Sequence, residues 1–310
     1  MPQPTAIIDL GTNTFQLLVA TRGNISDPMQ IICQLPRPVQ LGLGAMETGL
    51  LQEDAMERAL IALTEFRDVA LANGCENTRI HAIGTSILRR ASNTQQFVDE
   101  VNNRLGIKIQ VISGIEEADL IYHGIYHSLP QPWNPISLVM DIGGGSVEFI
   151  LFEGTKILFK VSLELGGLRL LSLFQQDGQF HLAKLGDMQA YILDQMKPLF
   201  VACAEHKPSV LIGAAGAFET IWDLANADRP TRVIPPASEL VITQFYQQKK
   251  LVQETDFVGR QNIKGMKAFR AGILPYANVL IATVLKELAI KNMWVSSYSL
   301  KEGYWFLQNK

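Results

Sequence analysis

The chain has 310 residues, of which 47% are hydrophobic and 18% are charged, and its formal net charge is −3. This composition allows two buried cores of ordinary size and does not indicate disorder. Because the chain has no overall basic field, we expect neither nucleic acid nor a membrane surface as a partner, and a polyanion would have to be held by a local patch.

The cysteines and the first residues predict a cytoplasmic protein. Cys33, Cys75 and Cys203 lie far apart and form neither a C-x-x-C pair nor a zinc-binding spacing. A reducing compartment suits such cysteines best. The opening "MPQPTAIIDLG" lacks a basic segment followed by an apolar core, so no signal peptide is expected. No apolar run reaches the length of about 18 residues that spans a bilayer.

Strands alternate with helices along the first half of the chain, as apolar spacing and turn residues indicate. The first two apolar runs flank "GTNT", which predicts a hairpin with hydroxyl and amide groups at its tip. The elements expected before the Pro-rich break "SLPQPWNP" are strands at 5–10, 15–20, 79–84 and 107–112 and helices at 52–73, 92–104 and from about 115.

After the break the pattern starts again with a strand, a glycine turn and a second strand. The elements expected here are strands at 136–141, 147–152, 156–165, 209–214 and near 293–297 and helices at 167–176, 184–205, after 216, at 275–290 and from about 299. This alternation predicts an α/β fold. We place the domain boundary at the break, with domain I at 1–130, completed if necessary by the helix at 299–310, and domain II at 131–310.

An internal repeat predicts that the two domains share one fold. "IIDLGTNTFQLLVA" (7–20) aligns without gaps to "VMDIGGGSVEFILF" (139–152), with an offset of 132. Separately, "IHAIGTS" (80–86) matches "SVLIGAA" (209–215) with an offset of 129. Two matches at nearly equal offsets indicate a duplication. Two like domains that face each other would direct both hairpin tips into one cleft, where ligands usually bind in α/β proteins.

The doubled hairpin tips predict a phosphate site. Glycines there let backbone N–H groups approach an anion closely, and hydroxyl side chains add donors. Carboxylates beside them would repel phosphate, so they are better explained as ligands of Mg²⁺. A plain glycine hairpin with solvated acids is the alternative, which one tip alone would favour. The candidate phosphate ligands are Gly11, Thr12, Asn13, Thr14, Gly143, Gly144, Gly145 and Ser146, and the candidate metal ligands are Asp9, Asp141 and Glu148.

Two glutamates open the helix in "VISGIEEADLIYHG" (111–124). Acidic residues in a first helical turn suit the helix dipole, which is one explanation for both. The other is that one of them accepts a proton from an attacking water. Glu116 and Glu117 lie about 100° apart around a helix, so at most one can face a substrate squarely.

Arginines after the strand at 79–84 are candidates for phosphate contacts. Arg89 and Arg90 could bind phosphate in a planar, bidentate manner or be a solvated surface pair. Further candidates for a basic track are Arg169 and the group Arg260, Lys264, Lys267 and Arg270, although most such runs are solvated. His123 and His127 have a metal-binding spacing without a third ligand, so we interpret them as half-buried histidines. The sequence contains no Walker loop, G-x-G-x-x-G or G-x-S-x-G.

Six segments occur together in order: "DLGTNTFQLLV", "GTSILRRASN", "VISGIEEADLIYHG", "MDIGGGSVEF", "LELGGLRLL" and "GAAGAFETI". They resemble the exopolyphosphatase / guanosine pentaphosphate phosphohydrolase (Ppx/GppA) family in a short two-domain form, and they cover nearly the whole chain. The resemblance implies the actin-like ATPase superfold: two duplicated ribonuclease H-like domains of α/β type with an interdomain cleft. It also implies Mg²⁺-dependent hydrolysis of a terminal phosphate.

The resemblance implies roles for individual residues. The second glutamate of the family's S-G-x-E-E-A motif is the catalytic base, and here that residue is Glu117. The family's D-x-G-G-G-S-x-E acids fall on Asp141 and Glu148, and its phosphate-binding arginine falls on Arg89. Thr12 and Thr14 replace serines and keep the hydroxyls.

The chain departs from the family in several places. Val147 replaces a common threonine, and Arg90 occupies a position that is often acidic. "GAAGAF", in the stretch 213–219, is poorer in glycine than the family's G-x-G-G-T loop, which weakens the expectation of a nucleotide-base or distal phosphate site there. The helical C-terminal domain of longer members has no counterpart in these residues, so processive action on long chains is not expected.

The sequence therefore predicts a cytoplasmic exopolyphosphatase, in which Mg²⁺ assists and Glu117 activates a water. The partner is inorganic polyphosphate or pppGpp, and the resemblance allows a homodimer. Three alternatives stay open at this stage. They are a pppGpp phosphohydrolase, a kinase of the same superfold, and a non-catalytic sensor of (p)ppGpp or polyphosphate. The acids at 117, 141 and 148 argue against the sensor, and no aspartate base or acceptor pocket supports the kinase.

Overall fold

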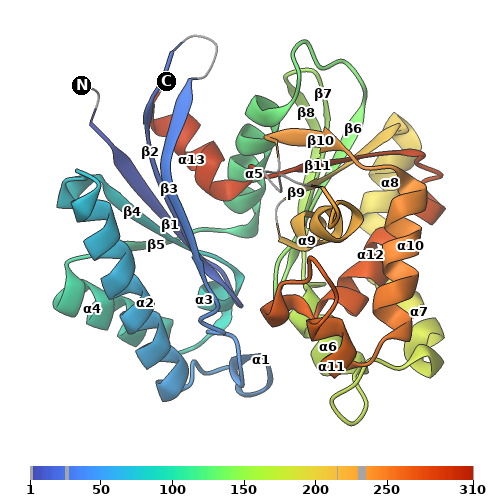
Figure 1. Ribbon diagram of the computed structural model, residues 1–310, viewed down its shortest axis with the longest axis horizontal. Helices are drawn as coiled ribbons and strands as arrows, with labels where there is room; N and C mark the ends of the chain where they lie inside the picture. Colours follow the sequence, from blue (N-terminus) through green and yellow to red (C-terminus); the bar gives the residue numbers. More distant parts are fainter. Residues whose placement is uncertain (1–2, 25–27, 215, 230–234, 310) are drawn as a thin grey trace. The chain divides into compact units, whose positions relative to one another are not determined.

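The computed structural model describes residues 3–24, 28–214, 216–229 and 235–309 (Figure 1). The chain divides into two compact units. Unit 1 comprises Met1–Gly124 and Leu300–Lys310, and unit 2 comprises Ile125–Ser299. Each unit is an α/β structure built around one sheet that contains parallel and antiparallel neighbours. In the part of the chain that the structure describes, no helix is both long and apolar enough to cross a bilayer.

A five-stranded sheet with the order β3-β2-β1-β4-β5 forms the centre of unit 1. The first three strands are antiparallel to one another, whereas β4 runs parallel to β1 and β5 runs parallel to β4. The strands are β1 (Thr5–Leu10), β2 (Phe15–Arg22), β3 (Met29–Arg37), β4 (Ile80–Gly84) and β5 (Ile109–Val111). The helices are α1 (Ala45–Thr48), α2 (Glu53–Ala72), α3 (Ser86–Arg90), α4 (Thr94–Leu105), α5 (Gly114–Ser128, which continues into unit 2) and α13 (Leu300–Gln308).

The two faces of the unit 1 sheet carry different kinds of side chain at the first hairpin. Ile8, Leu10 and Phe15 belong to the apolar core that the sheet forms with α2 and α4. Side chains alternate between the faces of a strand, so Asp9 and its cross-strand partner Gln16 lie on the opposite face. Helix α13 contacts β1 and β2 and reaches Gln16 there. The polar pair of the first hairpin is therefore on the α13 side.

A six-stranded sheet with the order β10-β11-β9-β6-β7-β8 forms the centre of unit 2. Its strands are β6 (Ser137–Ile142), β7 (Val147–Glu153), β8 (Lys156–Leu163), β9 (Val210–Ala214), β10 (Ala237–Glu239) and β11 (Asn292–Ser296). Its helices are α6 (Gly167–Phe174), α7 (Leu185–Gln195), α8 (Lys197–His206), α9 (Gly216–Ala225), α10 (Ile242–Glu254), α11 (Phe257–Gln261) and α12 (Leu274–Glu287).

The sheets confirm the predicted duplication. β6, β7 and β8 are antiparallel, and β9 and then β11 follow β6 in parallel, which repeats the order of unit 1. Both predicted hairpins form, and Asp141 pairs with Glu148 as Asp9 pairs with Gln16. The register corrects the second predicted alignment. Because Ile8 pairs with Ala82 and Met140 with Gly213, the offset between the parallel strands is 131 (213 minus 82) rather than 129.

The structure corrects one predicted element and adds others. The single helix expected at 184–205 is two helices, α7 and α8, because Pro198 lies in the first turn of α8, where a missing N–H is tolerated, and so begins a new helix. Strand β3 and helix α10 were not predicted. β3 is an edge strand on which most side chains are exposed or half-buried, so its sequence lacks the regular apolar alternation of a strand that is buried on one face.

Candidate active site

The tip of the first hairpin, Gly11–Thr14, is an ordered turn in unit 1. Thr12 and Thr14 are buried, being 3% and 9% exposed. The carbonyl oxygens of Thr12 and Asn13 accept hydrogen bonds from the backbone N–H groups of Gly42 and Gln40, each at 2.8 Å. A loop before α1 therefore covers this tip and fixes its backbone, and sequence reasoning did not find that loop.

A buried lysine stands beneath this hairpin. Lys301 of α13 is 5% exposed, and its Nζ donates to Oε1 of Gln16 at 3.0 Å. The same Nζ lies 3.5 Å from Oε1 of the fully buried Glu302. The position that corresponds to Glu148 of unit 2 is therefore a neutral amide held by an ammonium group. The sequence feature that could have indicated this buried lysine is the pair Lys301 and Glu302 in a C-terminal segment that also contains several apolar residues.

The structure separates the two glutamates at the start of α5. Ser113 and Glu116 form a reciprocal cap: the N–H of Ser113 donates to Oε2 of Glu116 at 2.7 Å, and the N–H of Glu116 donates to Oγ of Ser113 at 3.2 Å. These hydrogen bonds lower the pKa of the exposed Glu116. Glu117, in contrast, is 8% exposed. Glu116 thus caps the helix, and Glu117 is the carboxylate that is turned inward.

Arg89 forms an ion pair with this buried carboxylate. Its Nη1 donates to Oε2 of Glu117 at 2.5 Å and to the carbonyl oxygen of Ile112 at 3.2 Å. Arg89 belongs to α3, which follows β4, and Glu117 belongs to α5, which follows β5. Since β4 and β5 are parallel neighbours, their carboxyl ends bring the two helices together. The neighbouring Arg90 is exposed.

The glycine loop of unit 2 lies against the start of α6. The carbonyl oxygens of Gly143, Gly144 and Gly145 accept from the backbone N–H groups of Gly167, Leu168 and Gly166 at 2.9, 2.9 and 3.1 Å. A Cβ on Gly166 would overlap the backbone of Gly144 and Gly145. The bare backbone of Gly166 is thus needed for contact between the loop and the start of α6.

This contact sets the direction of the loop's amide groups. In a planar trans peptide the C=O and the following N–H point to opposite sides. Because the three carbonyl groups point toward α6, the N–H groups of Gly144, Gly145 and Ser146 point away from it. Three successive N–H groups on one side are an arrangement that can bind an anion. Ser146 is 1% exposed and closes the turn, since its carbonyl oxygen accepts from Gly143 N–H at 3.0 Å.

Asp141 and Glu148 are directly opposite each other on β6 and β7. Glu148 is 1% exposed and accepts from Oγ of Ser162 at 2.7 Å, and Oδ2 of Asp141 accepts from Oγ of Ser299 at 2.5 Å. Like charges at such a pair are destabilising, because their Cβ atoms are only about 5 Å apart. Sequence reasoning missed both serines, and neither carries a local motif that would have revealed it.

The pair Asp141 and Glu148 fits a magnesium ion. Mg²⁺ prefers oxygen ligands, and it commonly uses one or two carboxylates together with waters and substrate phosphates. Across the described ranges 3–24, 28–214, 216–229 and 235–309, no group of three or more histidine, cysteine or acidic side chains could hold a metal by itself. Among these residues, Asp141 and Glu148 are therefore a candidate pair of ligands and not part of a closed protein cage. The role of Asp9 as a third ligand stays a prediction.

The basic residues between 260 and 270 do not form one continuous positively charged surface. Lys264 pairs with Asp228 at 2.7 Å, and Lys267 lies 3.4 Å from Glu219 and 3.5 Å from Asp223.

Arg270 is placed differently from the lysines. A Cβ on Gly216 would lie 3.4 Å from its Nη1, which puts the guanidinium at the start of α9. Burial lowers the pKa of Arg270, and the charges of Glu219, Asp141 and Asp223 oppose that shift. Its spacing in the sequence gave no reason to prefer it over the lysines.

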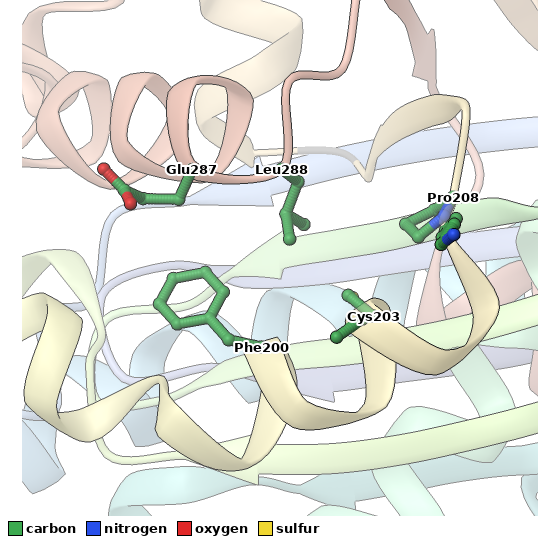
Figure 2. Close-up of a pocket in the computed structure, with 7 residues that line it drawn as sticks. Phe200, Cys203, Pro208, Glu287 and Leu288 are labelled. Carbon is green, nitrogen blue, oxygen red and sulfur yellow. The ribbon is translucent and has the colours of Figure 1, made fainter.

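A cavity of about 550 Å³ lies between α8 and the C-terminal end of α12 in unit 2 (Figure 2). Phe200, Cys203 and Leu288 point into it, and none of its lining residues is a predicted site residue. Burial raises the pKa of Cys203 to about 12, so its thiol is a poor nucleophile even though it borders a cavity.

We expect the three cysteines to react with a thiol reagent at different rates. Burial also raises the pKa of Cys75, whereas Cys33 is only half-buried. At pH 8 only about one in ten thousand Cys203 thiols is ionised, because the thiol titrates near 12. Titration of the native protein with a chromogenic disulfide should therefore show one fast thiol, which Cys33→Ser removes. A second thiol that reacts as fast in the folded protein would contradict the burial of Cys75 and Cys203.

Comparison with known proteins gives consistent matches. The family model described as "Ppx/GppA phosphatase family" matches residues 18–308. A crystal structure of an exopolyphosphatase from Cytophaga hutchinsonii has a TM-score of 0.92 and 33% identity, and the match covers 99% of this chain and 98% of that one. A Ppx/GppA family member from Aquifex aeolicus, with a TM-score of 0.80 and 23% identity over 99% of this chain and 98% of that one, shows the same fold.

A curated relative from Vibrio cholerae is named guanosine-5′-triphosphate,3′-diphosphate pyrophosphatase. It is 30% identical over 298 residues, which are 96% of this chain and 58% of the relative. The chain thus spans less than two thirds of the length of that protein.

Proposed function

Since this chain belongs to the Ppx/GppA phosphatase family, we propose that it is an exopolyphosphatase, which hydrolyses the terminal phosphoanhydride bond of inorganic polyphosphate. The observation that carries the proposal is the buried, ion-paired carboxylate of Glu117 at the start of α5. Identity of 33% over nearly the full length to the Cytophaga hutchinsonii exopolyphosphatase supports the same activity. The duplicated fold that carries this residue is the one the sequence predicted.

The residues of unit 1 are proposed to activate water and hold phosphate. Glu117 accepts a proton from a water whose oxygen attacks the terminal phosphorus, while the bond to the bridging oxygen breaks and the shortened chain leaves with that oxygen. Thr12, Asn13 and Thr14, together with Gly11, are proposed to donate hydrogen bonds to the phosphate, and the guanidinium of Arg89 adds positive charge.

The residues of unit 2 are proposed to bind phosphate oxygens and the metal. The N–H groups of Gly144, Gly145 and Ser146 share one direction, which supports the proposed phosphate-binding role of the Gly143–Ser146 loop. Asp141 and Glu148 would hold Mg²⁺, with Asp9 of unit 1 as a further ligand. When bound, Mg²⁺ supplies positive charge that offsets the charge of the phosphoryl group.

A pppGpp phosphohydrolase is the second candidate function. The 30% identity to the Vibrio cholerae guanosine-5′-triphosphate,3′-diphosphate pyrophosphatase favours it. Both substrates end in a phosphoanhydride, so the proposed base and phosphate loops serve either one. A sensor without catalysis would not need a buried carboxylate paired with arginine. We further propose a cytoplasmic location, which agrees with three free cysteines, and a homodimer, which gel filtration with light scattering would test.

We expect the purified protein to release phosphate from medium-length polyphosphate faster than from pppGpp and far faster than from ATP, each in the presence of Mg²⁺. Chelation of Mg²⁺ by EDTA should reduce the rate, and added Mg²⁺ should restore it. Phosphate release is measured with a colorimetric assay. A higher kcat/KM for pppGpp would move the assignment to the second candidate, and binding without release from any of the three would establish a sensor.

A further inference from the structure

The guanidinium of Arg89 already makes hydrogen bonds within the protein. Its Nη1 donates to Oε2 of Glu117 at 2.5 Å and to the carbonyl oxygen of Ile112 at 3.2 Å. The two side chains are 17% and 11% exposed, so water screens the pair only weakly. A role confined to phosphate binding would not explain why the arginine is held on the base.

The backbone around the pair is fixed on both sides. The N–H of Arg89 donates to the carbonyl of Thr85 at 3.1 Å, and the N–H of Glu117 donates to the carbonyl of Ser113 at 2.9 Å. The N–H of Ile112 donates to the carbonyl of Gly84 at 3.0 Å, which ties the end of β5 to the end of β4. Arg89 therefore holds the carboxylate from a rigid support, and a rotation of Glu117 would break a charge-assisted hydrogen bond.

The other terminal nitrogen of the same guanidinium, Nη2, differs from Nη1 in its surroundings. Nη2 of Arg89 is buried and has no hydrogen-bond partner among the residues that the structure describes. A buried donor without a partner is costly, so such a group usually marks a place where a ligand or water supplies an acceptor. A phosphate oxygen would be a suitable acceptor, since the planar guanidinium can donate in two directions at once.

We infer that Arg89 is a positioning residue for Glu117, because one arm of its guanidinium fixes the carboxylate while the other is available to a phosphate oxygen. The arginine then sets the distance between the base and the terminal phosphate. This inference rests on the proposed hydrolysis. It assigns Arg89 a role beyond that of a ligand that contributes only to substrate binding.

The test compares Arg89→Met and Arg89→Lys, with Arg90→Met as the matched control on the same helix. We expect kcat on polyphosphate to fall about 100-fold in both Arg89 variants, since a misplaced catalytic group costs about that much. Lysine keeps the charge but not the two-armed geometry. The acidic limb of the pH profile of kcat/KM should move to higher pH in Arg89→Met, because removal of a neighbouring cation disfavours an ionised carboxylate. Arg90→Met should leave kcat and the pH profile unchanged.

A double-mutant cycle separates positioning from binding. In a Glu117→Gln background the base is already absent, so adding Arg89→Met should lower the residual kcat by less than about threefold, which is the non-additivity expected of groups that act together. Calorimetric titration of Glu117→Gln with polyphosphate, with and without Arg89→Met, measures the contribution of the other arm to substrate affinity. If Arg89→Met does not fold, the kcat of Arg89→Lys still tests the inference.

Three results are decisive against the inference. Equal kcat losses from Arg89→Met in both backgrounds, an unmoved acidic limb, or full activity in Arg89→Lys would each make Arg89 a binding residue only. All three leave the proposed hydrolysis standing, because the wild type still releases phosphate. Failure of the wild type to release phosphate from polyphosphate, pppGpp or ATP would instead overturn the proposed function, and the positioning role with it.

Discussion

Replacing Glu117 by glutamine is expected to lower kcat on polyphosphate by roughly 10²–10⁴-fold, which is the usual contribution of a positioned general base. Glutamine has the same shape and can still accept a hydrogen bond from Arg89, but it cannot accept a proton from water. Binding of polyphosphate and the unfolding temperature should therefore change little. Phosphate release under saturating substrate measures the effect, and calorimetry measures the binding.

Glu116→Gln is the matched control for this experiment, because it changes the neighbouring glutamate on the same helical turn. Glu116 is exposed and caps α5 through Ser113, so its replacement should affect helix stability slightly and leave kcat unchanged. If Glu117→Gln turns over as fast as the wild type, Glu117 is not the base. If Glu116→Gln loses activity to the same extent, the assignment of the two glutamates is reversed.

Gly303→Ala is expected to lower the free energy of unfolding by about 3 kcal/mol, at the upper end of the range for overpacking. A Cβ on Gly303 of α13 would overlap the carbonyl group of Leu120 in α5 and would lie 2.9 Å from the N–H nitrogen of Gly124. These obstacles are helix backbone, so the two helices would have to move apart. The change is measured as a shift of the thermal or urea unfolding midpoint.

Gly186→Ala provides the control for this substitution. Gly186 lies in α7, and a Cβ there would have no atom within 4 Å apart from its chain neighbours and the nearby backbone of its own helix. Alanine should stabilise that helix by about 0.5–1 kcal/mol, since glycine is the poorer helix former. If Gly303→Ala is as stable as Gly186→Ala, the close approach of α13 to α5 is absent in solution.

The sequence predicted the duplicated fold because both copies of the hairpin keep the same polar positions. Asp9 and Asp141, and likewise Gln16 and Glu148, are at equivalent places in paired strands, and such places can be read from spacing. Which of the two glutamates, Glu116 or Glu117, is buried could also have been predicted from the sequence. Ser113 and Glu116 form an S-x-x-E capping motif, which assigns Glu116 to the helix cap and leaves Glu117 for other contacts.

Other parts of the candidate site could not be found in this way. Ser162, Ser299 and Lys301 act on residues far from them in the sequence, and no local pattern links a serine on β8 to Glu148 or a lysine on α13 to Gln16. The contact of the triple glycine with the start of α6 was not predicted, because a sequence does not show which other segment approaches a turn. Tertiary contacts of this kind depend on topology, which only the folded structure supplies.

The contact between the Gly143–Ser146 loop and α6 has a consequence for affinity. Helix α6 uses its first N–H groups on the protein's own carbonyls, so its dipole stabilises the loop rather than an incoming anion. In its proposed phosphate-binding role, the loop would therefore meet the ligand already in one conformation. Association would then lose little chain entropy at this point, and tight binding of a small oxyanion would not require a large buried area.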